Sequence, residues 1–272
     1  MERRRIIVVG YPKSGNTWVT RLTADLIDAP VRGFWLEPDN RDVAVEGAGR
    51  RTPIDVYKGH QVHSVIARTF APRDMIYVVR DVRDAAVSAA HYFSFRERCL
   101  RGRVAYAVRR LRERMSRRLD MEFRLTRMLS ALADGDGAIC PWCSRPWDEH
   151  VRGYLDAGVF IIRYEDVLVN PEIECRRLLR HIGVERTTQQ IRAAIRRQSF
   201  AVAKQRFIAA GDTARATFLR GGRTGDWKAA LTENQQVFCW SRFGPTLARL
   251  GYDTQGVAES LHVGIAGHRR HR

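Results

Sequence analysis

The sequence predicts an α/β fold, a single domain in which a P-loop-like central parallel β-sheet is flanked by α-helices. Short apolar runs that suit buried strands alternate along the chain with stretches of helical periodicity, the order that produces parallel sheets. The first apolar run, at residues 4–10, ends in a glycine and leads straight into a helical stretch. A strand, a glycine loop and a helix in this order form a phosphate-binding unit, because the backbone N–H groups at the helix start face an anion. The sequence shows no internal repeat and no clear linker between domains.

The elements of the first half can be justified in chain order. Residues 4–10 (RRIIVVG) form a short continuous apolar run, which is typical of a parallel strand covered on both faces. Residues 16–28 predict a helix because Trp18, Leu22 and Leu26 recur on one face. The elements expected next are strands at residues 54–60 and 75–80, a helix at residues 81–93, and a long arginine-rich stretch with helical spacing at residues 96–133.

The second half continues the alternation of strands and helices. Its expected elements are a loop at residues 133–146, a helix at 147–158, a strand at 159–166, helices at 172–182 and 187–197, an irregular segment at 199–223 and a helix at 232–250. Because ligands bind beyond the carboxyl ends of parallel strands, the loops that follow strands are the expected place for function. Residues 1–255 are expected to form the domain, and residues 256–272 a flexible basic tail.

The net charge and the hydropathy of the chain limit its expected binding partners and location. The chain of 272 residues has a formal net charge of +17, which favours polyanions such as nucleotides, nucleic acid, acidic glycans or anionic membranes. Only four of the 47 basic residues are lysines: Lys13, Lys58, Lys204 and Lys228. Lysine is a compact point charge and arginine a rigid fork, so these four positions are informative. No apolar run approaches the ~20 residues of a membrane span, and the apolar part of the N-terminus is too short for a signal peptide. We therefore expect a cytoplasmic protein.

The cysteines do not point to a metal or redox site. The five are Cys99, Cys140, Cys143, Cys175 and Cys239, and reduced thiols are expected in the absence of a signal peptide. The pair within CPWC, Cys140 and Cys143, has no second pair at the spacing of a zinc site and no thioredoxin-like context. Reduced loop thiols are the favoured interpretation of this pair, and a local disulfide is the alternative.

The stretch VVGYPKSGNTW, at residues 8–18, carries the clearest chemical signal. Gly10 and Gly15 have the spacing of a nucleoside-triphosphate P-loop, yet Asn16 stands where that motif requires its lysine. A lysine comes early instead, at Lys13. The residues of the loop alone leave two interpretations: a damaged nucleoside-triphosphate loop, or an intact loop for a different donor.

Four segments, taken in order, resemble the cytosolic-type sulfotransferases, which transfer a sulfuryl group from 3′-phosphoadenosine 5′-phosphosulfate (PAPS). YPKSGNTW is similar to the family's 5′-phosphosulfate loop, which more commonly has Thr in place of Asn16. VYKGHQ is similar to the strand that carries the family's catalytic histidine, and YVVRDVRDAAVSAAHYF to its 3′-phosphate motif. FLRGGRTGDWK is similar to its C-terminal arginine–glycine loop. The matches run from about residue 5 to residue 237, so the resemblance covers most of the chain.

The resemblance implies a PAPS-dependent sulfotransferase, with the sulfotransferase domain at residues 1–255. His60 would be the general base that takes the proton of the acceptor, and an imidazole with a pKa near ~6.5 suits this task at neutral pH. Lys13 and the loop N–H groups would stabilise the departing phosphate, and Lys58 completes the implied catalytic set. His63, three residues beyond His60, is interpreted as a surface residue. No metal is expected, because the Walker lysine and a clear Walker-B carboxylate are both missing.

The resemblance also implies which residues bind the donor. The loop would hold the 5′-phosphosulfate, three aromatic residues would contact adenine, and an arginine, a serine and the C-terminal loop would hold the 3′-phosphate. These residues are Lys13, Ser14, Gly15, Asn16, Thr17, Trp18, Arg80, Ser88, Tyr164, Phe200, Arg220, Gly221 and Gly222. An arginine fork beside close-approaching glycine backbone suits a phosphate.

Two rival functions follow from the same features. The glycine loop suits a P-loop ATP-dependent kinase, which would need magnesium, and the net charge suits a non-enzymatic polyanion-binding protein. The ordered set of four segments disfavours both rivals, and no specific nucleic-acid partner is expected.

The acceptor and the assembly are left open. The acceptor would offer a hydroxyl, or less often an amine, on a small molecule, a lipid or a glycan. The stretch from Arg96 to Arg127 suits either a solvated helix face or a platform for an acidic acceptor or a membrane surface. The dimer motif of the family's vertebrate members is only partly present, since Glu233 and Val237 depart from it.

Overall fold

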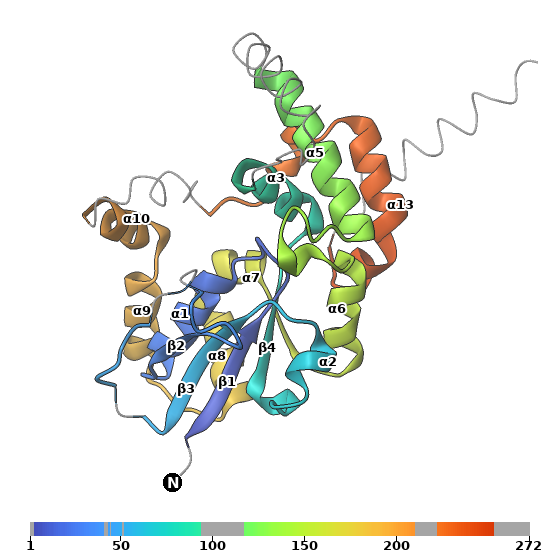
Figure 1. Cartoon of the computed structure of the whole chain (residues 1–272). Coiled ribbons are helices and arrows are strands. Elements are labelled where there is room, and N and C mark those ends of the chain that lie inside the picture. Colours follow the sequence, from blue (N-terminus) through green and yellow to red (C-terminus); the bar gives the residue numbers. More distant parts are fainter. Residues whose placement is uncertain are drawn as a thin grey trace, which may run out of the picture. The chain divides into compact units, whose positions relative to one another are not determined.

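The computed structural model describes residues 3–40, 43, 45–50, 52–93, 117–209 and 222–252 (Figure 1). In this part of the chain five strands form one sheet of order β2-β3-β1-β4-β5. The strands are β1 (Arg4–Val9), β2 (Val31–Phe34), β3 (Ile54–Gly59), β4 (Met75–Val79) and β5 (Phe160–Arg163). Neighbouring strands of this sheet pair in parallel throughout, so the predicted α/β fold with a parallel central sheet is confirmed.

The chain forms two compact units. Unit 1 comprises Met1–Arg80 and His150–Thr224 and contains the whole sheet. Unit 2 comprises Asp81–Glu149 and Gly225–Arg272 and is helical in its described residues.

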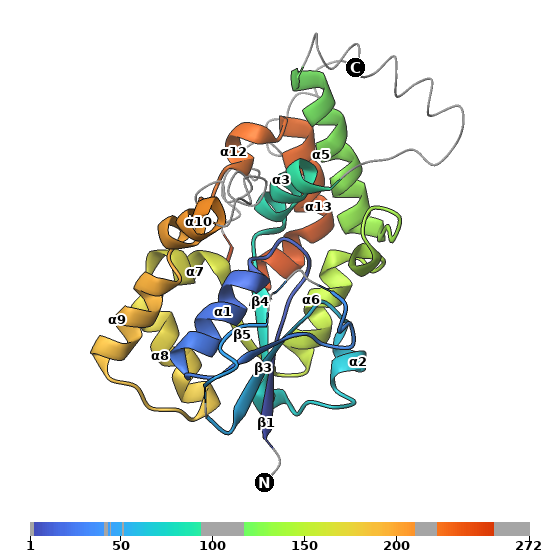
Figure 2. The ribbon, with the colours of Figure 1, turned by 60° about the vertical axis from the view of Figure 1, so that its left-hand side comes forward.

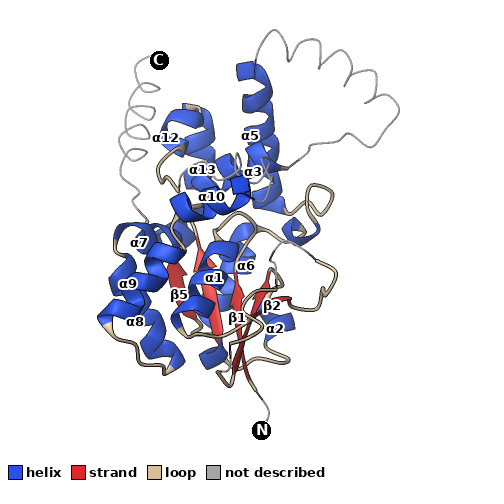
Figure 3. Cartoon of the chain, turned by 90° about the vertical axis from the view of Figure 1, so that its left-hand side faces the viewer, coloured by secondary structure: helices blue, strands red, loops and turns tan. Residues whose placement is uncertain are grey.

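Helices cover both faces of the sheet in unit 1. These helices are α1 (Asn16–Leu26), α2 (His63–Ile66), α7 (Tyr164–Val169), α8 (Pro171–Ile182), α9 (Thr188–Arg197) and α10 (Phe200–Ala209). Helices α1, α8 and α9 pack against one another (Figure 2), and α7, α8 and α9 lie on the opposite side of the sheet from α2 (Figure 3). Along β1 the side chains alternate between the two faces. Ile6 and Val8 accordingly belong to the core beneath α1 and α8.

Strand register brings four chain positions to one edge of the sheet. Val9 of β1 pairs with Gly59 of β3 and with Tyr77 of β4, and Val79 of β4 pairs with Arg163 of β5. The residues that follow these strand ends are Gly10, His60, Arg80 and Tyr164. In a parallel sheet they leave at the same carboxyl edge, where ligands bind.

Unit 2 is built on three helices that pack together: α3 (Val82–Tyr92), α5 (Arg117–Asp134) and α13 (Glu233–Arg249). Its shorter elements are η2 (Pro141–Cys143), α12 (Trp227–Ala230) and the start of α6 (Trp147–Asp156), which continues into unit 1. Helix α13 begins with a capping box, in which Thr232 and Gln235 bond to each other's backbone. In the described residues no helix is both long and apolar enough to cross a membrane.

Among the elements that differ from the sequence prediction are β2, β5 and α10. Strand β2 was not expected, because its four residues VRGF include a glycine and an arginine and give no apolar run. The strand expected at 159–166 ends at Arg163, where Tyr164 begins α7 instead. The segment expected to be irregular from residue 199 begins with α10, a helix of FAVAKQRFIA that starts at Phe200.

Candidate functional site

The loop between β1 and α1 has an unusual backbone. Lys13 has φ 72° and Gly15 has φ 91°, so two of its residues adopt the left-handed conformation. The Ser14 N–H donates to the carbonyl of Tyr11 at 3.2 Å, and helix α1 then starts without a side-chain cap. The Ser14 hydroxyl is 1% exposed and has no hydrogen-bond partner among the described residues. A helix start that lacks a cap and carries a buried free hydroxyl suits an anion.

Tyr164 and Arg80, two residues that the resemblance assigns to the donor, stand beside this loop. A Cβ added to Gly15 would come within 2.5 Å of the Tyr164 ring, so only glycine fits between loop and ring. The guanidinium of Arg80 lies over the same ring, 4.6 Å from its centroid. Arg80 also donates to the carbonyls of Lys13, at 3.5 Å, and of Arg223, at 3.2 Å. These contacts within the protein therefore hold Arg80 against the loop.

Three aromatic rings form a row next to the loop. The ring of Trp18 lies 5.6 Å from Tyr164, edge to face, and 5.0 Å from Phe200. Gly222 packs so closely on Phe200 that a Cβ there would collide with the ring. The indole N–H of Trp18 donates to the carbonyl of Gln198 at 2.7 Å, which fixes the first ring of the row. The structure thus brings the three predicted aromatic residues together with Gly222.

Lys58 and His60 lie at the end of β3. Lys58 is 2% exposed, and its ammonium lies 5.3 Å from the centroid of the Phe34 ring. His60 is 6% exposed and follows β3 directly, so it faces the loop that follows β1. Its Nδ1 atom is 2.6 Å from the carbonyl oxygen of Gly10 and 2.9 Å from Nδ2 of Asn16.

The surroundings of His60 keep its ring neutral. Burial lowers the pKa of His60 well below its ordinary value of 6.5, and the positive charge of Lys58 lowers that pKa further. His150 and Lys13 act in the same direction, whereas the hydrogen bond to the Gly10 carbonyl raises the pKa. A neutral imidazole at pH 7 has a lone pair with which to accept a proton.

The buried residues that hold His60 in place were not predicted from the sequence. His150, on α6, donates from Nε2 to the carbonyl of His60 at 2.9 Å and accepts at Nδ1 from the Tyr77 hydroxyl, also at 2.9 Å. The Tyr154 hydroxyl donates to the carbonyl of Gln61 at 2.7 Å. The only available signal was that His150 and Tyr154 are four residues apart and share a helix face.

His63 is not the surface residue that we expected. It begins α2 half-buried, and its ring lies edge-on to Tyr154 with 5.3 Å between the centroids. The α2 turn folds this histidine back toward α6, which a single sequence does not reveal.

His150 should make the stability of the protein depend on pH. Burial lowers its pKa from 6.5 to about 4, so the unfolded chain binds a proton between these values and the folded chain does not. Stability from this group is complete above pH 6.5 and is lost as the pH falls toward 4. The shift corresponds to a loss on the order of 3 kcal/mol. Urea unfolding between pH 7.5 and 4.5 should therefore show a shallower pH dependence in His150→Gln than in the wild type. Parallel slopes in the two proteins would contradict a buried neutral His150.

The third and fourth family-like segments meet in unit 2. Asp84 of α3 accepts hydrogen bonds from the backbone N–H groups of Gly225, at 2.6 Å, and Trp227, at 3.1 Å. The guanidinium of Arg83 lies 3.8 Å from the centre of the Trp227 ring and pairs with Asp81 at 2.7 Å. Ser88 is half-buried on α3, one turn after Asp84. The start of α3 and the GDW segment are thus joined by their own side chains.

Several predicted positions lie outside the described residues. They are Arg220, Gly221, Cys99 and the part of the arginine-rich stretch before residue 117, together with residues 256–272. The remaining predicted donor residue, Thr17, is half-buried in the first turn of α1. Cys140, Cys143, Cys175 and Cys239 are buried and are not joined in disulfides among the described residues, which agrees with the favoured interpretation of Cys140 and Cys143 as reduced thiols.

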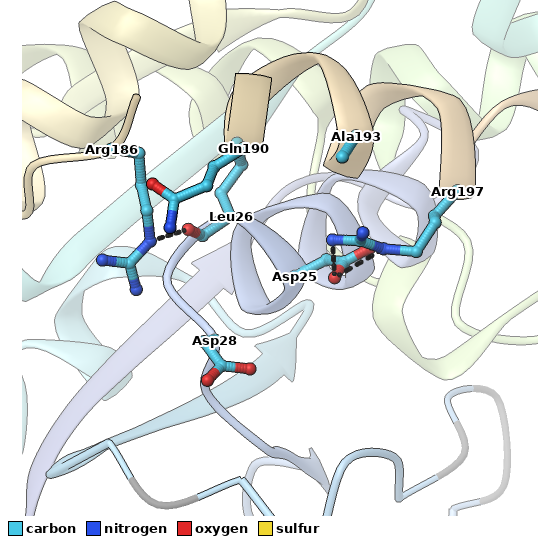
Figure 4. Close-up of a pocket in the computed structure, with 7 residues that line it drawn as sticks. All are labelled: Asp25, Leu26, Asp28, Arg186, Gln190, Ala193 and Arg197. Carbon is cyan, nitrogen blue, oxygen red and sulfur yellow. Dashed lines mark hydrogen bonds and ion pairs between the residues drawn. The ribbon is translucent and has the colours of Figure 1, made fainter. Parts of the chain in front are cut away.

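A pocket of about 410 Å³ lies at the other end of α1 from the loop (Figure 4). Its charged groups are satisfied by the protein itself: Arg197 donates to the Asp25 carboxylate at 2.8 Å, and Arg186 donates to the carbonyl of Leu26 at 2.8 Å. Asp25 also accepts from the amide of Gln198, whose carbonyl holds Trp18. Of the pocket residues, Asp25 thus supports the residue that holds the first ring of the aromatic row.

A family model described as the sulfotransferase domain matches residues 3–251 of the chain. Among curated relatives, bovine sulfotransferase 1A1 is 21% identical, and the alignment covers 89% of this chain and 83% of the relative. The 3-alpha-hydroxysteroid sulfotransferase of Cavia porcellus is 23% identical, over 84% of this chain and 78% of the relative.

Solved structures share the fold. Mouse sulfotransferase SULT7A1, complexed with PAP, has a TM-score of 0.60 at 17% identity and covers 90% of this chain and 85% of its own. Retinol dehydratase, in complex with androsterone and the inactive cofactor PAP, has a TM-score of 0.58 at 16% identity, with 89% and 80% covered.

Proposed function

This chain belongs to the sulfotransferase domain family, and we propose that it transfers a sulfuryl group from PAPS to a hydroxyl group of an acceptor. One observation carries the proposal: a loop suited to an anion and a buried neutral histidine meet through the carbonyl of Gly10. Sulfuryl transfer needs both an anion site for the leaving phosphate and a base for the acceptor. The relatives with PAP, which is PAPS without its sulfuryl group, support this donor.

The residues present fit such a donor. The uncapped start of α1 and the buried Ser14 hydroxyl offer hydrogen-bond donors for the 5′-phosphosulfate. The buried Nε atom of Arg80 has no hydrogen-bond partner in the part of the chain that the structure describes, so it is left to donate to a phosphate. We assign Arg80 to the 3′-phosphate on this ground, and Ser88, Arg220, Gly221 and Gly222 to the same phosphate on the resemblance alone.

The aromatic row supplies a surface for a base. Trp18, Tyr164 and Phe200 are held in place by Gln198, Arg80 and Gly222, so their faces are oriented before a ligand arrives. Stacking of a base on an aromatic ring contributes ~1–3 kcal/mol. We assign this row to the adenine of the donor.

The catalytic step follows from the positions of His60 and Lys13. PAPS supplies a sulfuryl group whose leaving group is a phosphate. The Nε2 atom of His60 accepts the proton of the acceptor hydroxyl as its oxygen attacks the sulfur, and His60 ends the step as the imidazolium. Lys13 and the N–H groups of residues 14–17 stabilise the negative charge that develops on the departing phosphate. Lys58, buried at the end of β3, adds a positive charge on the side of His60.

The acceptor is assigned only by its reacting group. A neutral histidine base suits a hydroxyl, and less well an amine, on a small molecule, a lipid or a glycan. The kinase alternative is disfavoured because the residue at the position of the P-loop lysine is Asn16, an uncharged side chain that is buried and donates to the Gly10 carbonyl.

Calorimetry and a transfer assay test the proposed function. PAP should bind the purified protein without magnesium, ATP with magnesium should bind far more weakly, and labelled PAPS should transfer sulfate to at least one member of an acceptor panel. Arg80→Met should weaken PAP binding about tenfold to a hundredfold, since a hydrogen bond to a charged group contributes ~1.5–3 kcal/mol. Arg180→Met, an exposed arginine on α8, is the matched control and should bind PAP as the wild type does.

Preferential binding of ATP with magnesium would favour a kinase instead. Salt-sensitive nucleic-acid binding that survives Lys13→Ala, without any affinity for PAP, would favour the polyanion-binding alternative.

A further inference from the structure

Asn16 joins the loop to His60. It is the first residue of α1, and its side chain is 3% exposed and turned back toward the sheet. Its Nδ2 atom is 2.7 Å from the carbonyl oxygen of Gly10 and 2.9 Å from Nδ1 of His60. The Nδ1 atom of His60 is itself 2.6 Å from the same Gly10 oxygen. Three polar atoms, from the residues that follow β1 and β3 and from the start of α1, therefore meet beneath the loop and are buried.

Chemistry fixes the proton positions in this group. The Gly10 oxygen can only accept, so the amide atom beside it is the NH₂ of Asn16, which leaves Oδ1 on the other side. Oδ1 is buried without a hydrogen-bond partner among the described residues. A nitrogen 2.6 Å from a carbonyl oxygen must carry a proton, because two lone pairs at this distance repel each other. His60 therefore donates from Nδ1, and the lone pair of its neutral ring is on Nε2. The amide of Asn16 and Nδ1 of His60 are then two donors that share the Gly10 oxygen, and their 2.9 Å approach is not a hydrogen bond.

We propose that Asn16 is a positioning residue for His60: by donating to the Gly10 carbonyl, its amide fixes the acceptor of the Nδ1–H bond, so that the imidazole keeps the Nδ1–H form and Nε2 is the basic atom. Gly10 accepts from both side chains with its two lone pairs, and the amide fixes the direction of that carbonyl. A ring turned by 180° would place a carbon at the carbonyl and lose the bond. This inference rests on the proposed function, because it gives His60 the role of base.

The same contact explains why a P-loop lysine is absent at this position. A lysine there would need to extend toward phosphate, whereas the Asn16 side chain is short enough to fold beneath the loop and reach Gly10. The backbone N–H of Asn16 takes no part in the side-chain bond to Gly10 and can still face an anion at the helix start. One residue thereby contributes its backbone to the anion site and its side chain to the base.

Nitrogen NMR tests the tautomer without any acceptor. Long-range ¹H–¹⁵N spectra of the labelled full-length protein distinguish Nδ1–H from Nε2–H imidazole, and His60→Gln identifies the signal of His60. We expect the Nδ1–H form in the wild type and a mixture containing Nε2–H in Asn16→Leu. Thr23→Val is the matched control: Thr23 is buried on the same helix, its hydroxyl has no partner in the described part of the chain, and the signal should not change. An Nε2–H ring in the wild type, or an unchanged Nδ1–H signal in Asn16→Leu, would overturn the proposal.

Kinetics separate positioning of the base from binding of the donor. Asn16→Leu should lower kcat about tenfold to a hundredfold, the range found when a group that orients a catalytic ligand is removed. Its calorimetric affinity for PAP should equal that of the wild type, because the backbone N–H groups are intact. Weaker PAP binding with unchanged kcat would assign the side chain to the donor and overturn the proposal. A wild type that neither binds PAP nor transfers sulfate would refute the proposed function, whereas the NMR result would stand by itself.

A third variant tests whether Asn16 acts through His60. Asn16→Asp places a carboxylate beside Nδ1 and should raise the pKa of His60, moving the acid limb of kcat/KM to higher pH. The other groups that face His60 are Lys58, Lys13 and His150, which are unchanged in this variant and lower its pKa. An acid limb that does not move would show that the side chain at position 16 does not act on His60. Equal melting temperatures of Asn16→Leu and Thr23→Val would exclude a general loss of structure.

Discussion

Replacing His60 with glutamine should lower kcat for sulfate transfer about 10²- to 10⁴-fold, the contribution that a general base typically makes. Glutamine can still donate a hydrogen bond to the Gly10 carbonyl, so the buried oxygen keeps a partner, but it has no lone pair basic enough to take a proton. The variant should therefore fold and bind PAP as the wild type does. Stopped assays with labelled PAPS would measure the rate, and calorimetry the binding of PAP.

The matched control for His60 is His63→Gln, which changes a half-buried histidine three residues away that packs on Tyr154. Its rate should match the wild type. A His60→Gln enzyme with full activity would remove His60 from the mechanism. The wild-type pH profile offers a second check. Because the pKa of His60 lies well below 6.5, kcat/KM should stay level from pH 8 down to 6.5 and fall only in more acid solution.

The sequence predicted the β1 strand and the loop at its carboxyl end well, because local residue patterns determine both. The short apolar run of Ile6 to Val9 is typical of a covered strand, and the glycines at positions 10 and 15 have the spacing of a phosphate-binding loop. Strand β2 and helices α7 and α10 were not predicted, since four residues with a glycine, or a helix that starts directly at a strand end, carry too little periodicity. Their presence depends on contacts that the surrounding fold supplies.

As with the helices and strands, some of the site residues could be predicted from the sequence and others could not. Those that belong to a motif, such as Ser14 and Gly15, could be named from their spacing. The residues that support them could not, because His150 is 90 positions from His60, whose carbonyl accepts its hydrogen bond. The role of Asn16 illustrates the limit most clearly. Its departure from threonine was visible in the sequence, but the reason depends on a contact with a histidine 44 residues away.

Lys13 should be the second position at which a substitution nearly abolishes activity. Removing one group that stabilises developing charge typically costs about 10²- to 10³-fold in kcat. Lys13→Met keeps the Cβ and the chain length, so the left-handed loop backbone at φ 72° and the carbonyl that accepts from Arg80 remain available. We therefore expect kcat to fall by this factor, while PAP binding weakens much less because the lost charge matters most as the phosphate departs.

Two comparisons make the Lys13 prediction specific. Lys204→Met removes another of the four lysines, an exposed one on α10, and should leave the rate unchanged, which excludes a general effect of net charge. Lys13→Arg keeps the charge but replaces a mobile point charge with a rigid fork, so it should recover only part of the activity. The positive charge of Lys13 also lowers the pKa of His60, so Lys13→Met should move the acid limb of kcat/KM to higher pH. A variant with wild-type kcat and an unmoved acid limb would show that Lys13 neither stabilises the leaving group nor acts on the base, and the charge would then have to come from Lys58 or Arg80.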